Sequence, residues 1–180
     1  MNILLHVCCA PCLIHPFREL SLIDNNSVTG FFYNPNIHPF TEFKARLDAA
    51  KGYSDTIGMK LIVHKYDMEN FFKRLGPNIE PQNRCGICWR MRLHETALYA
   101  KENGFDAFAS TLLVSPYQSR EDILKIGWHI ADEQKIEFVD RDWRPGFKEA
   151  QAFARENNIY RQKYCGCVFS EKERYCKKRE

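Results

Sequence analysis

The sequence predicts a single α/β domain in which a mostly parallel sheet carries helices on both faces. Short apolar runs of strand length alternate along the chain with longer segments whose apolar residues recur at helical spacing, and this alternation is typical of parallel sheets. The length of 180 residues suits one domain. We find neither an internal repeat nor a linker long enough to separate two domains, so residues 1–180 are expected to fold as one unit.

Five segments rich in β-branched and aromatic residues are expected to form strands. They are residues 2–7, 28–33, 59–66, 106–111 and 136–139. The first strand ends at a group of cysteines, and the second ends at the turn signal Asn34-Pro35-Asn36. In open parallel sheets, ligands bind beyond the carboxyl ends of the strands, near the point where strand order reverses. The first cysteine group is therefore expected to lie at a ligand-binding edge.

Six segments are expected to form helices. They are residues 16–23, 41–57, 67–75, 87–103, 119–130 and 147–157. Gly58 and Gly104 follow the second and fourth helices, where helix ends favour glycine. Asp67 is a suitable N-cap for the third helix, and Ser119 with Asp122 resembles a capping box for the fifth.

Composition excludes several classes of protein. With 44% hydrophobic and 13% aromatic residues, the chain can bury a core and does not resemble a disordered protein. The first residues carry no positive n-region, and no apolar stretch approaches the roughly 18 residues of a membrane span. We therefore expect a cytoplasmic protein with no membrane partner. The net charge of +3 permits a nucleic-acid partner without predicting one.

The cysteines are the most informative feature of the sequence. Seven of the eight fall into three tight clusters: Cys8, Cys9 and Cys12; Cys85 and Cys88; and Cys165 and Cys167. Eight cysteines in 180 residues is well below the roughly 8–10% that marks a disulfide scaffold. In a reducing compartment, close thiols usually serve as metal ligands or redox catalysts. Cys176 stands alone in a charged tail and is expected to be incidental.

The three clusters differ in their chemistry. Cys8 and Cys9 are adjacent at a strand end, so their side chains diverge and can serve different atoms of one metal cluster. The C-x-x-C pair Cys85 and Cys88 is expected to open a helix, whose N-terminus would lower the pKa of a thiol. The glycine between Cys165 and Cys167 lets both sulfurs face one iron or close an easily reduced disulfide. Spacing alone leaves zinc and iron–sulfur sites both open.

Several charged residues have an ordinary interpretation beside a functional one. Glu42 and Arg46 are expected to form a surface i,i+4 pair. The arginines around the C-x-x-C could grip phosphate or form a solvated basic face; they are Arg84, Arg90 and Arg92. The tail is expected to be a basic, solvated stretch through Lys172, Arg174, Lys177, Lys178 and Arg179. The six histidines are expected to be structural.

Together, these motifs resemble the QueH-type family of cobalamin-independent epoxyqueuosine reductases, in order and over nearly the whole chain. The stretches that carry the resemblance are His6 to Cys12, Tyr33 to Pro39 with Glu42 and Arg46, Arg84 to Cys88 with Arg92, Leu112 to Gln118, Asp142 with Arg144, and Tyr160 to Cys167. The resemblance implies reduction of the epoxide of epoxyqueuosine, at the tRNA wobble position, to the alkene of queuosine, as the last step of queuosine biosynthesis. It also implies a fold of the adenine-nucleotide hydrolase-like (HUP-like) type.

The resemblance further implies a [4Fe–4S] cluster with Cys8, Cys9, Cys85 and Cys88 as ligands. Cys165 and Cys167 match the family's redox-active pair, which forms a dithiol and disulfide or, with Cys12, holds an additional iron. The double cysteine stands where related folds carry a Gly-rich phosphate loop, so we do not expect the protein to use ATP.

Reducing an epoxide to an alkene takes two electrons and releases the oxygen as water, so a second redox centre and an electron donor, as yet unidentified, are expected. We expect Asp142 to supply protons, and Tyr117 and Arg84 to contact the anticodon loop of the tRNA. Two other functions remain open from the residues alone. One is an iron–sulfur enzyme of tRNA thiolation, and the other is a zinc-binding RNA module.

Overall fold

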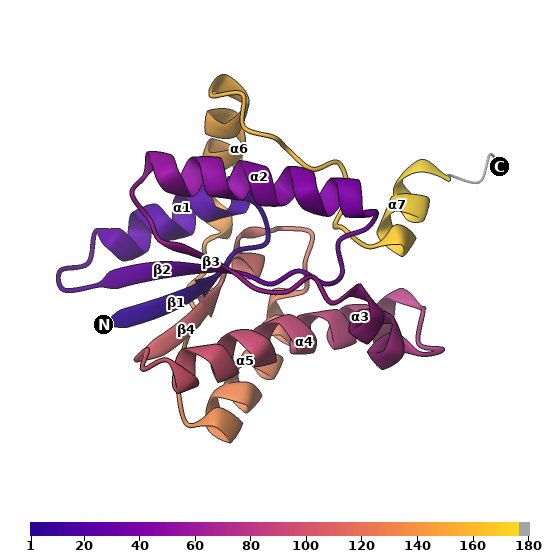
Figure 1. Ribbon diagram of the computed structural model, residues 1–180, viewed down its shortest axis with the longest axis horizontal. Helices are drawn as coiled ribbons and strands as arrows, with labels where there is room; N and C mark the ends of the chain where they lie inside the picture. The colour runs from indigo at the N-terminus through magenta and orange to yellow at the C-terminus, as the bar shows by residue number, and fades with distance from the viewer. Residues whose placement is uncertain (177–180) are drawn as a thin grey trace.

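A computed structural model describes residues 1–176 and confirms the predicted α/β class (Figure 1). Its single sheet has five parallel strands in the order β3-β2-β1-β4-β5. The strands are β1 (Asn2–His6), β2 (Ser27–Phe32), β3 (Leu61–Val63), β4 (Ala107–Ser110) and β5 (Glu137–Val139). In the register of the sheet, Leu4 of β1 lies opposite Thr29 of β2 and Phe108 of β4.

Helices cover both faces of the sheet, as the alternation of strands and helices predicts (Figure 1). One face carries α1 (Ala10–Ser21), α2 (Phe40–Thr56) and α6 (Phe147–Glu156), with α1 packed against the other two. The opposite face carries α3 (Met68–Leu75), α4 (Pro81–Glu102) and α5 (Arg120–Gln134), with α4 packed against its two neighbours and the central strands. Two short 3-10 turns, Thr111–Val114 and Arg144–Gly146, and a last helix, α7 (Val168–Tyr175), complete the described chain.

The core lies around the two central strands. Leu4 and Leu5 of β1 and the three residues Ala107 to Ala109 of β4 are fully buried, as expected for parallel strands that helices cover on both sides. The order of the strands reverses between β1 and β4, since β2 and β3 follow on one side and β5 on the other. The carboxyl ends of β1 and β4 therefore flank the crevice where such sheets bind ligands.

Two helices begin earlier than the sequence patterns suggest. Helix α1 begins at Ala10, with Pro11 in its first turn and Pro16 inside it. Proline is well tolerated at a helix start, because the backbone N–H that it lacks would have no hydrogen-bond partner within the helix there. This start places Cys12 in the first turn of α1 and makes the extended residue Cys9 its N-cap.

Helix α4 begins at Pro81 rather than near residue 87. The C-x-x-C therefore lies inside a helix, and not at its N-terminus as expected. The short helix α7 lies within what the sequence suggests is only a charged tail, and it ends before Cys176. Of the predicted basic tail, Lys177, Lys178 and Arg179 lie outside the described residues.

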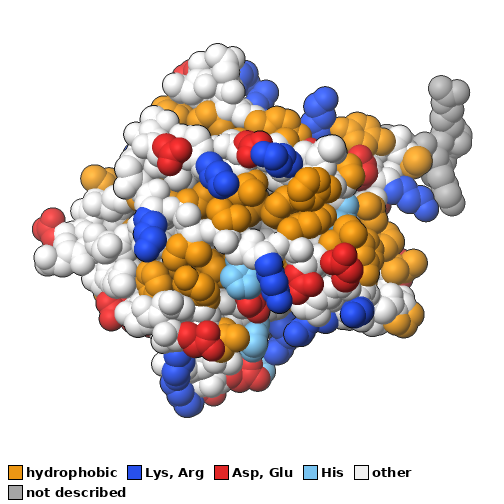
Figure 2. Space-filling model, in the orientation of Figure 1, with side chains coloured by type: hydrophobic (Ala, Val, Ile, Leu, Met, Phe, Trp, Pro, Cys, Tyr) orange, Lys and Arg blue, Asp and Glu red, His pale blue; other side chains and the backbone are white. Residues whose placement is uncertain are grey.

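Charge is mixed over the part of the surface seen in Figure 2. Basic and acidic side chains are interspersed across this face, and apolar side chains gather between α2 and α3. Exposed apolar residues there include Phe40 and Phe72. None of the described helices is both long and apolar enough to cross a membrane.

Close packing between α5 and β5 generates a test of the fold. A Cβ added at Gly127 of α5 would overlap the ring of Phe138 in β5. We expect Gly127→Ala to lower the free energy of unfolding by about 1–3 kcal/mol, because overpacking must shift the ring or the helix. Denaturant unfolding of both proteins in the same metal-loaded state measures the change.

Gly52 of α2 is the matched control, since a Cβ there meets no atom within 4 Å. Gly52→Ala should leave the stability unchanged or raise it by up to about 1 kcal/mol, because alanine favours a helix more than glycine does. Equal effects of the two substitutions would contradict the packing of Gly127 against Phe138.

Candidate metal centre

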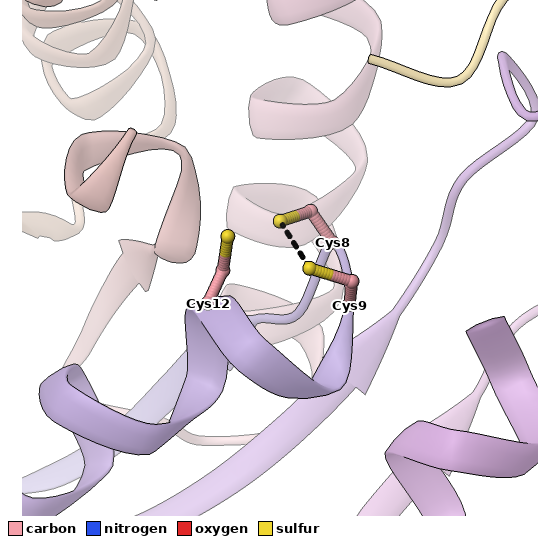
Figure 3. Close-up of side chains that lie close together, drawn as sticks. All are labelled: Cys8, Cys9 and Cys12. Atoms are coloured by element: carbon pink, nitrogen blue, oxygen red, sulfur yellow. Dashed lines mark hydrogen bonds between the residues drawn. The ribbon is translucent and has the colours of Figure 1, made fainter. Parts of the chain in front are cut away.

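Three thiols of the first cysteine cluster converge at the carboxyl end of β1 (Figure 3). Cys8 follows the strand, Cys9 caps α1 and Cys12 lies in the first turn of that helix. The three Sγ atoms lie within 4.8 Å of one another, and those of Cys8 and Cys9 are 3.7 Å apart. The structure therefore brings Cys12 to Cys8 and Cys9 as a group that can hold a metal ion.

The electrostatics of this group favour one negative sulfur. Hydrogen bonds from Cys12 and Cys9, with the positive charge of Arg92, hold the pKa of Cys8 well below its usual range. The pKa of Cys9 is raised, first by burial, and that of Cys12 is raised by its hydrogen bonds to the other two thiols and by burial. Two protonated thiols beside a thiolate are the arrangement that a metal ion converts to three thiolates, releasing protons as it binds.

The backbone around Cys8 is held by the neighbouring strand. The N–H of Cys8 donates to Oγ1 of Thr111, just beyond β4, at 3.0 Å. On β1, Nδ1 of His6 lies 2.9 Å from Oγ of Ser110. Burial and the charge of Arg92 lower the pKa of His6 to about 3, so the imidazole is neutral. These contacts join the ends of the two strands that flank the crevice.

Arg92 of α4 reaches from the opposite layer to the same place. Its Nε lies 3.3 Å from Nε2 of His6, its Nη2 donates to Oδ1 of Asn34 at 2.8 Å, and its Nη1 lies 3.9 Å from Sγ of Cys88. Asn34 in turn donates from Nδ2 to the carbonyl oxygen of Val7 at 2.9 Å. The guanidinium group of Arg92 is buried and binds partners within the protein, so Arg92 is not part of a solvated basic face.

Cys85 and Cys88 lie one turn apart within α4, so both thiols extend from the same side of the helix. Burial raises the pKa of each, that of Cys88 to about 12. The expectation that a helix N-terminus lowers these pKa values is wrong, because Pro81 starts the helix a full turn earlier. Negative charge on Cys165 would raise the pKa of both thiols further, which indicates that the second and third clusters are close.

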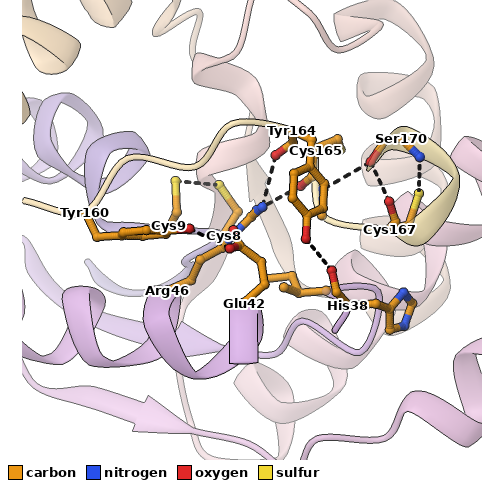
Figure 4. A network of polar contacts seen from close by, with 12 residues as sticks. Cys8, Cys9, His38, Glu42, Arg46, Tyr160, Tyr164, Cys165, Cys167 and Ser170 are labelled. Atoms are coloured by element: carbon orange, nitrogen blue, oxygen red, sulfur yellow. Dashed lines mark hydrogen bonds and ion pairs between the residues drawn. The ribbon is translucent and has the colours of Figure 1, made fainter. Parts of the chain in front are cut away.

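The third cluster is held in place by a buried ion pair on α2 (Figure 4). Nη1 and Nη2 of Arg46 donate to the carbonyl oxygens of Cys165 and Tyr164 at 2.9 and 3.0 Å. Its Nε donates to Oε1 of Glu42 at 2.7 Å, and Tyr160 donates to the other oxygen of Glu42 at 2.5 Å. The prediction of a surface pair is corrected, since Arg46 is 2% exposed.

Gly166 fits this segment against the loop after β2. Its φ of 144° lies in a region that favours glycine, and a Cβ there would lie 3.1 Å from Ile37. The carbonyl oxygen of Gly166 accepts from the N–H of His38 at 2.8 Å. A larger residue between the two cysteines would therefore push the segment away from this loop.

The thiols of the third cluster have different surroundings. Sγ of Cys165 accepts from Nε2 of Gln118 at 3.3 Å, and Gln118 accepts from Nε1 of Trp89 at 2.6 Å. Cys167 caps α7, and its Sγ accepts from the N–H of Ser170 at 3.4 Å. All eight cysteines, including the exposed Cys176, are free thiols in this structure.

Three other predicted site residues have clear positions. Tyr117 is 87% exposed in the same loop as Gln118. Arg84 is 5% exposed, pairs with Glu173 of α7 at 2.5 Å and lies over the ring of Phe169. Its charge is matched inside the protein by Glu173, and its contact with the RNA stays a prediction.

Asp142 lies beside Arg144. It accepts hydrogen bonds from the guanidinium group of Arg144, which lower the pKa of its carboxyl to about 2. Its role as a proton donor stays a prediction.

The donor set fits an iron–sulfur group. The site gathers buried thiols and backbone amides, and no Asp or Glu is buried among the residues that the structure describes. Thiolates suit iron–sulfur clusters and zinc, whereas hard cations require oxygen ligands. Asn34, Thr111 and Gln118 hydrogen-bond to Arg92, Cys8 and Cys165. Residue type alone could not predict these contacts, although the sequence did show the turn around Asn34.

Comparison with known proteins supplies the family. Residues 3–173 match the family described as "Epoxyqueuosine reductase QueH". The chain is 38% identical to the epoxyqueuosine reductase QueH of Dehalococcoides mccartyi over 177 residues, which cover 98% of this chain and 96% of that protein. It is 36% identical to the Helicobacter pylori protein of the same name, covering 93% of this chain and about half (48%) of that protein.

A solved structure supports the fold. The U34-tRNA thiolase NcsA from Methanococcus maripaludis, with its [4Fe–4S] cluster, superposes with a TM-score of 0.56 at 14% identity. The match covers 94% of this chain and 61% of that one. A likeness of this kind concerns the fold, whereas the sequence matches extend through all three cysteine clusters. The chain belongs to the QueH family of epoxyqueuosine reductases.

Proposed function

We infer that this protein reduces epoxyqueuosine to queuosine at the wobble position of tRNA. The observation that carries the inference is the convergence of the Cys8, Cys9 and Cys12 thiols at the carboxyl edge of the sheet, in a chain that belongs to the QueH family. The family implies an oxidoreductase of queuosine biosynthesis. The geometry provides a group of converging thiols that can hold a metal centre.

The reaction balances with two electrons and two protons. Both C–O bonds of the epoxide break, the carbon–carbon double bond forms, and the oxygen leaves as water. A dithiol that becomes a disulfide releases two electrons and two protons. In this proposal Cys165 and Cys167 supply both, and an external electron donor, whose identity is open, restores the dithiol. Desolvation of its thiol raises the pKa of Cys165, which favours the protonated form that this proposal requires.

We assign Cys8, Cys9, Cys85 and Cys88 as the ligands of a [4Fe–4S] cluster, the cluster type that the archaeal thiolase of the same fold carries. When bound, the cluster supplies low-potential electrons. The alternative role of Cys165 and Cys167 is to hold an additional iron together with Cys12, whose Sγ lies beside those of Cys8 and Cys9. Hydrogen bonds with Thr111, Arg92 and Gln118 hold Cys8, Cys88 and Cys165 in place.

Tyr117 is the proposed contact for the tRNA. Its ring is exposed and lies edge-on to Phe147, and it stands one residue from Gln118, which touches Cys165. Proteins commonly hold splayed RNA bases by stacking them on such rings. The exposure of this ring close to the third cysteine cluster supports the proposal.

The proposed function is tested with protein purified without oxygen. It should contain iron and acid-labile sulfide, and with a low-potential reductant it should convert epoxyqueuosine in tRNA to queuosine, measured by mass spectrometry of the nucleosides. Cys85→Ser and Cys88→Ser should lose the cluster absorbance and the activity, because a hydroxyl is a poor ligand for iron.

Cys176→Ser is the matched control, since Cys176 is exposed at the end of α7. It should retain iron, sulfide and activity. Zinc as the only metal in the wild type would contradict the reductase and favour the zinc-binding RNA module. Formation of a thiolated nucleoside would favour a thiolation enzyme instead.

Counting iron and sulfide in Cys167→Ser separates the two roles of the third cluster. If Cys165 and Cys167 cycle between dithiol and disulfide, the variant should keep its full iron and sulfide and fail under multiple turnover, because one thiol cannot supply both electrons. If they bind an additional iron, it should lose about one iron per protein and keep all sulfide. Loss of the whole cluster would contradict both roles.

Replacing Tyr117 tests the RNA contact. Tyr117→Ala should weaken tRNA binding by roughly 1–3 kcal/mol, the usual contribution of one base stacked on an aromatic ring, and Tyr117→Phe should bind normally. Binding measured over a salt series should weaken as salt rises. Equal turnover of the free nucleoside and the tRNA would show that the RNA body is not gripped.

A further inference from the structure

Three arginines are buried in the described protein, and they differ in how their charge is matched. Arg46 is 2% exposed and pairs with Glu42 at 2.7 Å, and Arg84 is 5% exposed and pairs with Glu173 at 2.5 Å. Arg92 is 3% exposed, and within residues 1–176 it forms no ion pair with a carboxylate.

The partners of Arg92 are neutral groups and one sulfur. His6, Asn34 and Cys88 receive its three hydrogen bonds. The imidazole of His6 must be neutral, because its Nε2 faces the N–H of a cation. A buried charge without a counter-charge costs several kcal/mol, so a protein keeps one only where something else supplies the opposite charge.

Among the residues that the structure describes, sulfur atoms are the remaining source of negative charge near this guanidinium group. Cys88 lies 3.9 Å from Nη1, and Cys8 follows Val7, whose carbonyl oxygen binds the same Asn34 side chain that Arg92 binds. Cys8 lies between β1 and α1, whereas Cys88 lies in α4. Arg92 contacts residues around both. Its charge is thus placed between the first and second cysteine clusters.

We propose that Arg92 is the buried counter-charge of the anionic iron–sulfur site and makes the bound cluster easier to reduce. The inference rests on the proposed function, because it requires that a cluster binds there. Reduction adds one negative charge to the site, and a fixed positive charge in a medium of low dielectric constant favours the more negative state. Arg92 is thereby a positioning residue that acts on the substrate only through the cluster.

The reduction potential of the loaded protein tests this proposal directly. In an equilibrium redox titration of the full chain, followed by the electron paramagnetic resonance of the reduced cluster, Arg92→Gln should lower the ratio of reduced to oxidised cluster at least tenfold at a fixed potential. For a one-electron couple, tenfold corresponds to about 59 mV. Arg92→Lys, which keeps the charge and loses the planar fork, should stay within about threefold of the wild type.

Arg90→Gln is the matched control on the same helix. Arg90 is half exposed and lies 3.8 Å from Glu133, so solvent screens its charge and the ratio should stay within about threefold. A ratio within threefold in Arg92→Gln would overturn the proposal. An equal shift in Arg92→Lys and Arg92→Gln would also overturn it, because shape rather than charge would then be responsible.

If Arg92→Gln does not bind the cluster, Asn34→Asp tests whether the charge of Arg92 favours the reduced cluster. The new carboxylate would lie where Oδ1 of Asn34 now accepts from Arg92 at 2.8 Å, and it would match the charge of the arginine without removing it. The proposal requires the same tenfold fall in the reduced fraction, and an unchanged ratio overturns it. A wild type that holds no iron–sulfur cluster would instead contradict the proposed function itself.

Discussion

The guanidinium group of Arg46 joins the C-terminal segment of the chain to the helical layer over the sheet. It donates hydrogen bonds to two successive carbonyl oxygens of that segment, and its Nε donates to Glu42. Tyr160 binds the same carboxylate, so one buried pair fastens the segment at two points. Breaking a buried ion pair typically costs about 3–5 kcal/mol, and here two carbonyl oxygens would also lose their donors. The position of the third cysteine cluster depends on this contact.

The fold class could be predicted because local patterns and global architecture agree. Apolar strands and amphipathic helices alternate, and the sheet assembled from them is parallel throughout. The starts of α1 and α4 were harder to predict from the sequence, because a proline can either begin a helix or end the segment before it. At Pro11 and Pro81 it occupies the first turn. At α4, that difference of a few residues puts Cys85 and Cys88 inside the helix instead of at its N-terminus.

The site was visible in the sequence as clusters of cysteines, since ligand spacing is a local property. The environment of those thiols was not, because it is assembled from separate elements. Arg92 comes from α4, Asn34 from the loop after β2, and Gln118 from the loop before α5. Whether an arginine faces solvent or the interior depends on such tertiary contacts, so Arg46, Arg84 and Arg92 all appeared more exposed from the sequence than they are.

The way Arg46 holds the third cluster bears on how this site can change during evolution. The arginine binds main-chain carbonyl oxygens, including that of Cys165, and its guanidinium group lies over the ring of Tyr164. Any residue at position 165 presents the same carbonyl oxygen to the guanidinium group. A thiol there can therefore be exchanged for an imidazole or a carboxylate without detaching the segment. The anchor is independent of the chemistry that it carries, so related chains can acquire new metal or redox preferences while keeping one scaffold.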